Sequence, residues 1–210
     1  MRTSGRFIAL CARSFAIGLL ALVLSACSRT VTWEEEVPLN TGETIWIERS
    51  MPWKLLGAAG NPFDLALRPT RHQTIRFTYH GRPYIYEGKA DISWIAVSPK
   101  TGAPILVAPA ASFAWDNENS FYCTVPHYVQ LSPDSTGRTW TWPDRIETWL
   151  YGTPANVMSS IPSLSEHGAL RYTHDEKERR DAVYRLQFPP GARIDSTYKE
   201  NACVVKFGTR

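Results

Sequence analysis

The chain has few of the residues, and none of the local motifs, on which most enzyme sites are built. Its 210 residues include five histidines and four cysteines. No two histidines have the i, i+2 or i, i+4 spacing that would place both on one local face for a metal ion. The patterns Gly-x-Ser-x-Gly and His-Glu-x-x-His and the phosphate-binding loop are absent. The sequence therefore predicts no catalytic residues, no metal site and no cofactor, and it predicts that the protein is not an enzyme.

The chain also lacks an excess of charge once its N-terminal segment is set aside. The whole sequence has 23 Lys and Arg against 20 Asp and Glu, and three of the arginines lie in the first 26 residues, where there is no acid. The rest of the chain is formally neutral. A neutral chain has no basic excess with which to bind phosphate backbones, so nucleic acid is not expected as a partner.

Long apolar runs are missing after the N-terminal segment. That segment has a basic lead with three arginines, then an apolar stretch at residues 14–24, then small residues before Cys27. This succession is typical of a secretory signal peptide, and the apolar stretch is shorter than the roughly 20 residues of a membrane-spanning helix. Residues 1–26 are therefore predicted to be a signal peptide.

The segment ends in Leu24, Ser25, Ala26 and Cys27, and these four residues resemble the lipobox of bacterial lipoproteins. The resemblance implies that Cys27 becomes the N-terminus, carries a diacylglyceryl group on its thiol, and attaches the protein to a membrane through this lipid anchor. In such lipoproteins an aspartate directly after the lipidated cysteine implies retention in the inner membrane. The residue here is Ser28, which implies the outer membrane, with the protein facing the periplasm. Each buried methylene group of a lipid contributes ~0.8 kcal/mol to membrane binding, so two or three acyl chains on Cys27 would attach the protein firmly. The alternatives are an ordinary signal peptide with an incidental cysteine and an uncleaved anchor.

The other cysteines are candidates for a disulfide bond. Cys11 lies in the leader, which leaves Cys123 and Cys203. An exported chain meets an oxidising compartment, where two such cysteines can pair. A bond that closes a loop of about 80 residues contributes roughly 4–5 kcal/mol in the chain-entropy model. The alternative is two buried free thiols.

Short alternating stretches bounded by turn residues predict a mainly β fold. Three hairpins are expected, around turns at residues 40–43, 80–83 and 98–102. Further short strands are expected at residues 121–125, 128–131, 139–142 and 203–207. Two segments rich in proline, residues 51–70 and 154–166, are expected to be an irregular loop and a connector. Residues 146–150 fit a strand or a helix.

One segment, residues 175–186, has a helical pattern. Thr173 is its candidate cap, acids fill the first turn, and Ala182, Val183 and Leu186 form an apolar stripe.

The expected fold class is therefore an antiparallel sandwich or a curved sheet, built from short hairpins, with one helix. It would form a single domain over residues 32–210. A lipidated tether at residues 27–31 would join this domain to the membrane anchor.

An acidic run lies within the first predicted strand. We interpret Glu34, Glu35 and Glu36 as a solvated strand edge, whose charges discourage edge-to-edge pairing. A cation site is the alternative.

Aromatic residues give the strongest indication of binding. The sequence has eight tryptophans, and Trp115, Trp140 and Trp142 are candidates for an aromatic binding face. Trp140 and Trp142 alternate along a strand and therefore share a face. The alternative is that they pack in the core, as most aromatic side chains do.

A second resemblance agrees with the first. The stretch from Thr32 to Asn40, with residues 122–131 and Trp140, is similar to β-rich lipoproteins of Gram-negative bacteria whose function is uncharacterised, and it implies no activity. The expected function is a structural or binding role in the cell envelope, with an envelope protein or a cell-wall glycan as partner. The alternatives are a small-ligand carrier, which needs a deep apolar cavity, and an envelope hydrolase, which needs a histidine and an acid in one pocket.

Overall fold

The computed structural model describes residues 28–58, 61–70, 72–109, 126–142, 146–166 and 170–198. Several predictions lie outside these residues and stay predictions: the strands at 121–125 and 203–207, the lipobox residues Leu24, Ser25, Ala26 and Cys27, the cysteines Cys123 and Cys203, and Trp115. No helix in the described ranges is long and apolar enough to cross a membrane.

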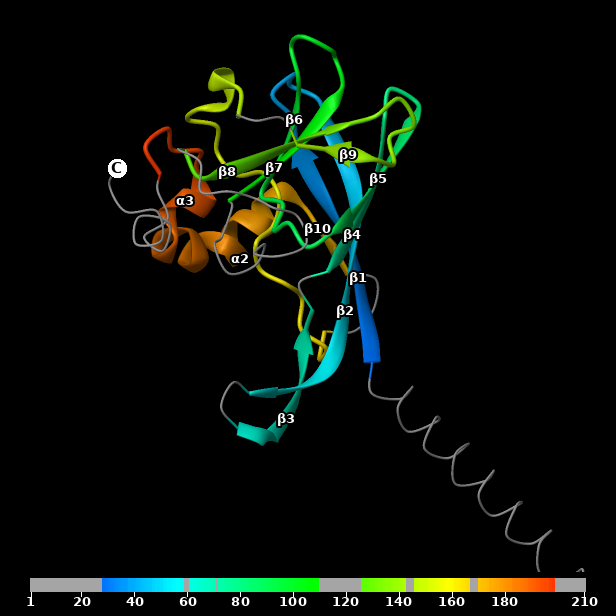
Figure 1. Ribbon diagram of the computed structural model, residues 1–210, viewed down its shortest axis with the longest axis vertical. Coiled ribbons are helices and arrows are strands. Elements are labelled where there is room, and N and C mark those ends of the chain that lie inside the picture. The colour runs from blue at the N-terminus through cyan, green and yellow to red at the C-terminus, as the bar shows by residue number, and fades with distance from the viewer. Residues whose placement is uncertain are drawn as a thin grey trace, which may run out of the picture. The chain divides into compact units, whose positions relative to one another are not determined.

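The described chain is mainly β, with two open sheets and one long helix, which confirms the expected class of fold (Figure 1). It divides into two compact units. One contains the described residues of Val31–Met51 and Arg71–Arg210, and the other contains those of Met1–Thr30 and Pro52–Thr70. The prediction of one domain over residues 32–210 stays a prediction.

The first sheet has six strands, ordered β10-β1-β2-β4-β5, with β3 paired to β2. Their bounds are β1 Ser28–Pro38, β2 Thr44–Ala58, β3 Asn61–Pro69, β4 Gln73–Tyr79, β5 Arg82–Gly88 and β10 Leu170–Tyr172. β1 begins at Ser28 rather than at Thr32, so most of the predicted tether belongs to a strand. β10, which pairs with β1 in parallel, was not predicted.

Two predicted hairpins of this sheet are confirmed, and their turn residues explain them. In the β1–β2 turn Leu39 donates its N–H to the Glu43 carbonyl (2.8 Å), and Gly42 has a φ of 85°. In the β4–β5 turn both His80 and Gly81 have positive φ (48° and 75°). Positive φ at two successive residues matches the twist of the strands that such a turn joins.

Residues 51–70 are not the irregular loop that the sequence predicted. They form the second half of β2 and all of β3, paired antiparallel from Trp53 opposite Pro69 to Gly57 opposite Leu65. Thr70 donates its N–H to the Pro52 carbonyl (2.8 Å), so Pro69 stands at a position that needs no N–H. Proline is therefore compatible with this two-stranded ribbon, although the prolines of this segment had suggested an irregular loop.

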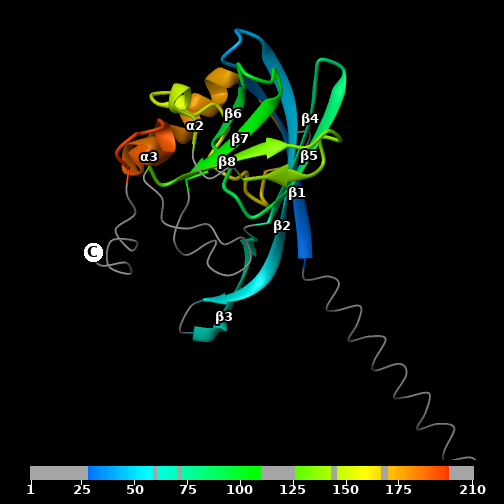
Figure 2. The same ribbon diagram turned by 45° about the horizontal axis from the view of Figure 1, so that its top comes forward.

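The second sheet has four antiparallel strands: β6 Trp94–Val97, β7 Pro104–Pro109, β8 Tyr128–Pro133 and β9 Trp140–Thr141. Figure 2 shows β6, β7 and β8 side by side. The predicted hairpin around residues 98–102 is thereby confirmed.

β6 and β7 are buried on both faces because two clusters enclose them. One face, with Ile95 and Leu106, packs on side chains of the first sheet and forms the main core. The other face, with Trp94 and Val107, packs on Leu150 and Ile194. This arrangement explains why these strands are continuous apolar runs rather than alternating ones.

Three helical segments complete the described chain: the 3₁₀ helix η1 Thr148–Leu150, α2 His174–Gln187 and the short α3 Pro189–Ala192. α2 contacts β10 and α3, and Figure 1 shows α2 and α3 in orange and red. Its predicted cap is confirmed, because Thr173 and Glu176 form a capping box.

The predicted apolar stripe of α2 is wrong. Val183 and Leu186 are 64% and 82% exposed, and Ala182 is also exposed. The buried side chains of this helix are Lys177 and Asp181. These two side chains join the helix to β1 and to residues 159–160 through an ion pair with Glu35 and hydrogen bonds from Ser159 and Ser160.

Candidate functional site

An aromatic cavity of about 430 Å³ lies beside β5, β8 and β9. Its lining residues are Tyr86, Glu87, Gly88, Lys89, Leu131, Arg138, Thr139, Trp140 and Trp142. The structure therefore brings Trp140 and Trp142 together at one cavity. Both are partly buried and pack against the main core, as the alternative interpretation held.

Two aromatic rings form a fixed wall of this aromatic cavity. Trp140 donates its indole N–H to the carbonyl of Ile85 (2.7 Å), and its ring meets that of Tyr86 edge to face, with centroids 6.3 Å apart. Edge-to-face geometry is a favourable one for aromatic pairs. Strands β5 and β9 together therefore fix the position of this wall.

Tyr86 offers a protonated hydroxyl at the cavity. Burial raises the pKa of Tyr86 to about 12, although the N–H that Ala90 donates to its oxygen (2.9 Å) acts in the other direction. The hydroxyl therefore keeps its proton at neutral pH. A Cβ at Gly88 would lie 2.7 Å from the Tyr86 ring carbon that bears the hydroxyl, so any other residue at this position would displace the Tyr86 ring.

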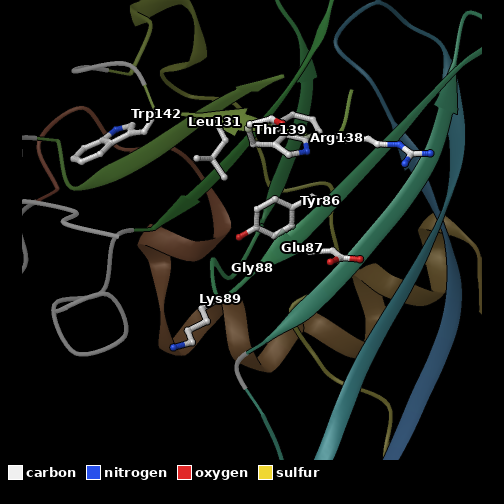
Figure 3. Close-up of a pocket in the computed structure, with 9 residues that line it drawn as sticks. Tyr86, Glu87, Gly88, Lys89, Leu131, Arg138, Thr139 and Trp142 are labelled. Carbon is white, nitrogen blue, oxygen red and sulfur yellow. The ribbon is translucent and has the colours of Figure 1, made fainter. Parts of the chain in front are cut away.

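Charged side chains surround the aromatic wall. Figure 3 shows the Tyr86 ring in the middle of the set, with Lys89 and Arg138 on different sides of it and Glu87 beside it. Flat apolar surfaces next to a few polar groups are typical of sites that orient a small polar ligand.

The turn that carries Arg138 and Trp140 is docked on β5. Its Asp134 carboxylate accepts N–H groups from Thr136, Arg138 and Thr139 (3.0–3.4 Å). The hydrogen bond from the Thr136 hydroxyl is the main reason why the pKa of Asp134 is lowered to about 2. Gly137 accepts a hydrogen bond from the Ile85 N–H (2.9 Å) through its carbonyl. The turn therefore holds the side of the aromatic cavity that Arg138 and Trp140 form against the side that β5 forms.

We predict that Gly137→Ala destabilises the protein by more than the usual cost of positive φ. Gly137 has a φ of 74°, and a Cβ there would lie 2.5 Å from the backbone oxygen of Pro83, which cannot move aside alone. Gly42→Ala and Gly102→Ala are matched controls, because their φ values are 85° and 67° and nothing lies within 4 Å. The controls should lose about 1–2 kcal/mol in denaturant unfolding. An equal loss in all three variants would show that the turn does not press on β5.

The acidic run was interpreted wrongly for its middle residue. Glu35 is 0% exposed and lies on the buried face of β1 with Trp33 and Val37. Its carboxylate binds Arg49 (2.9 Å) and Lys177 (3.1 Å) and accepts the N–H of Met158 (2.7 Å). We call Glu35, Arg49 and Lys177 the buried ionic cluster. Strand alternation was the signal that placed Glu35 inside.

Further hydrogen bonds to protein groups surround the buried ionic cluster, although the Arg49 Nε has no hydrogen-bond partner among the described residues. Arg49 donates to the Gln73 side chain (2.7 Å) and to the Met158 carbonyl (2.5 Å), and Lys177 donates to the Asn156 carbonyl (2.6 Å). One turn along α2, Asp181 accepts the N–H groups of Ser159 and Ser160 (2.7 and 2.9 Å). These contacts join β1, β2, the connector and α2, so the cluster serves the fold.

Opposing effects act on the charges of the cluster. Burial raises the pKa of Glu35, but Arg49 and Lys177 together lower it by more, so its pKa is below the usual range. Burial lowers the pKa of Lys177, and Glu35 offsets part of this change. The carboxylate of Glu35 is therefore charged at neutral pH and forms ion pairs with both Arg49 and Lys177.

A second cavity, of about 500 Å³, is bordered by the connector and α2. His174 and Glu178 lie there 3.9 Å apart, and Glu178 binds Arg185 at 2.5 Å. In the part of the chain that the structure describes, no three His, Cys, Asp or Glu residues are grouped to hold a metal ion.

Comparison with models of known protein families, with curated proteins and with solved structures finds no match for this chain.

Proposed function

We propose that the protein is a lipoprotein of the cell envelope, anchored through lipid on Cys27, that binds a cell-wall glycan through the aromatic cavity. The anchor rests on the lipobox sequence, and the outer membrane facing the periplasm is its proposed location. The observation that carries the binding role is the aromatic cavity, where Tyr86, Trp140 and Trp142 meet charged side chains.

The chemistry of the aromatic cavity favours a glycan over an apolar ligand. Sugar rings have apolar faces that can lie on an indole or phenol ring, and hydroxyl groups that bond to polar side chains at the edge. Lys89, Arg138 and Glu87 supply donors and acceptors of both charges, and the Tyr86 hydroxyl keeps its proton. Cell-wall glycans also carry carboxylates, which suit the two cationic residues. Binding, without bond breaking, is the role that this set of groups supports.

We expect Trp142→Ala to weaken binding of soluble cell-wall glycan fragments at least tenfold, a loss of about 1.4 kcal/mol. The indole lines the aromatic cavity, so its removal deletes a stacking surface. Isothermal titration calorimetry with the purified protein measures the change. Trp46→Ala is the matched control, because Trp46 is also partly buried but lines a different hollow. Equal affinity of wild type and the Trp142 variant, or equal loss in both variants, would contradict the proposal.

A further inference from the structure

Strand β5 forms one edge of the first sheet, so some of its backbone groups point away from β4. In an antiparallel ladder, residues that bond to the neighbouring strand alternate with residues whose N–H and C=O groups point outward. Ile85 is an outward residue, because its N–H bonds to the Gly137 carbonyl (2.9 Å) and its carbonyl accepts the Trp140 indole N–H (2.7 Å). The pairing of β4 with β5 has no break in register, so Pro83 and Glu87 are outward residues as well.

Two of these three outward positions are closed. Pro83 has no N–H to donate, and both backbone groups of Ile85 are bonded to the turn that is docked on β5. Proteins commonly close a sheet edge in such ways, because open backbone groups pair with other extended chains. At Glu87, by contrast, no residue of the described ranges bonds to the N–H or to the carbonyl. The edge of β5 is therefore open at one residue.

The open residue borders the aromatic cavity. Glu87 lines this cavity next to Tyr86 (Figure 3). On one side of Glu87 the docked turn occupies the edge at Ile85, and on the other side the strand ends at Gly88. Ala90 then donates its N–H to the Tyr86 hydroxyl (2.9 Å). The opening thus has the length of one residue, which is too short for a strand of another protein but suits a short extended segment that exchanges one N–H and one C=O.

The chemistry of this opening indicates the class of ligand. The N–H and C=O of one strand residue point to the same side but belong to two successive amide groups. A partner that bonds to both must itself have an amide on each side of one carbon atom, as an amino-acid residue within a peptide has. The acetamido group of a sugar cannot do this alone, because the N–H and C=O of a single trans amide point in opposite directions. Cell-wall glycans carry short peptides on their sugars.

We infer that the aromatic cavity binds a peptide-bearing cell-wall glycan, whose first peptide residue exchanges two hydrogen bonds with the backbone of Glu87. This inference rests on the proposed function and names its ligand more closely. A residue paired with Glu87 has its side chain on the same face as the Glu87 side chain, and the groups before and after it point to the opposite face. That opposite face is the face of Tyr86, whose ring meets the ring of Trp140. The sugar, which precedes the peptide, is thereby directed to these two rings.

Isothermal titration calorimetry of the purified protein with defined probes tests the inference. The probes are N-acetylmuramic acid, the same sugar with the peptide L-alanyl-D-isoglutamine, and acetyl-L-alanyl-D-isoglutamine without the sugar. We expect the sugar with the peptide to bind roughly tenfold more tightly than either part alone, because two hydrogen bonds and the ring contact then act together. Methylation of the alanine nitrogen removes the N–H that the Glu87 carbonyl accepts, and it should weaken binding about fivefold.

Glu87→Pro is the variant that tests the backbone contact. Proline removes the outward N–H but no hydrogen bond of the β4–β5 ladder, as Pro83 does four residues earlier, so the sheet should be kept. This variant should bind the sugar with the peptide about fivefold more weakly than wild type and should bind the sugar alone equally well. Glu87→Ala is the matched control, because it removes the carboxylate, keeps the N–H and should bind like wild type.

The other results each count against a defined claim. Equal affinities for the sugar with and without the peptide would overturn the peptide contact and leave glycan binding in place. Equal losses in the proline and alanine variants would also overturn it, since the carboxylate would then be the contact. If the proline variant does not fold, an unchanged affinity of wild type for the methylated probe overturns the pairing. Peptide that binds equally well without the sugar would support the pairing at Glu87 and contradict the glycan role of the proposed function, and binding of none of the probes would overturn both.

Discussion

Replacing Glu35 with alanine is expected to lower the free energy of unfolding by about 3–5 kcal/mol, the range seen when one partner of a buried ion pair is removed. The side chains of Arg49 and Lys177 are at most 2% exposed, so neither cation can turn to water when the carboxylate is lost. The Met158 N–H would lose its acceptor as well. Urea unfolding followed by tryptophan fluorescence measures the change.

Glu34→Ala is the matched control for this variant. Glu34 is the preceding residue of the same strand, but its ion pair with Arg171 (3.4 Å) is about half exposed. Its loss should cost less than about 1 kcal/mol. The double variant Glu35→Ala, Lys177→Met should be less destabilised than the sum of the single changes, because the second change removes a stranded charge. Additive losses, or equal losses for Glu34 and Glu35, would contradict the role given to the buried ionic cluster.

The pH dependence of stability gives another measure of the same carboxylate. Folding lowers the pKa of Glu35 from its ordinary value of 4.5. A group whose pKa is lowered by folding stabilises the folded state above its unfolded pKa, and this contribution is lost as the pH falls through the folded pKa. Below about pH 4.5, wild type should therefore lose stability more steeply than Glu35→Gln. Parallel curves would show that Glu35 is not held as a carboxylate.

Replacing Cys27 with alanine is expected to move the protein from the membrane fraction to the soluble fraction or to leave it unprocessed. The proposed lipid anchor is attached to the Cys27 thiol, and the alanine variant has no thiol at this position to carry it. Two or three acyl chains, at ~0.8 kcal/mol per buried methylene, hold far more firmly than one chain alone. Fractionation of cells and mass spectrometry of the N-terminal peptide measure the result.

Cys11→Ala is the control for this prediction. It removes a cysteine from the same N-terminal segment but leaves Leu24, Ser25, Ala26 and Cys27 intact. The Cys11 variant should be processed and lipidated like wild type. Fatty acid on the Cys27 variant, or a wild-type N-terminus at another residue, would contradict the proposed anchor.

Local sequence signals predicted the hairpins well because a hairpin depends on nearby residues. Alternation identified β1, β4 and β5, and the residues between them suit the turns, as the positive φ of Gly42 and Gly81 shows. The cap of α2 was predictable for the same reason, since Thr173 and Glu176 are three residues apart.

The features that were missed depend on partners far away in the sequence. Lys177 is buried because Glu35 lies against it, and Glu35 is buried because Arg49 and Lys177 both reach it. Alternation along β1 indicates the inner face for Glu35, but nothing in the local pattern indicates that Lys177 is buried. Likewise, Trp140 and Trp142 are close in the sequence and both line the aromatic cavity, but their neighbour Tyr86 comes from another strand, β5, and only the fold brings it there.

The parallel pairing of β1 with β10 sets the order in which the chain can mature. Trp33 is opposite Leu170, so the first strand made by the ribosome waits for a partner from the last quarter of the chain. Such long-range pairing slows folding, and until it forms the open edge is able to bind other extended chains. The edge of β1 that β10 covers therefore stays open until Leu170–Tyr172 has folded against it.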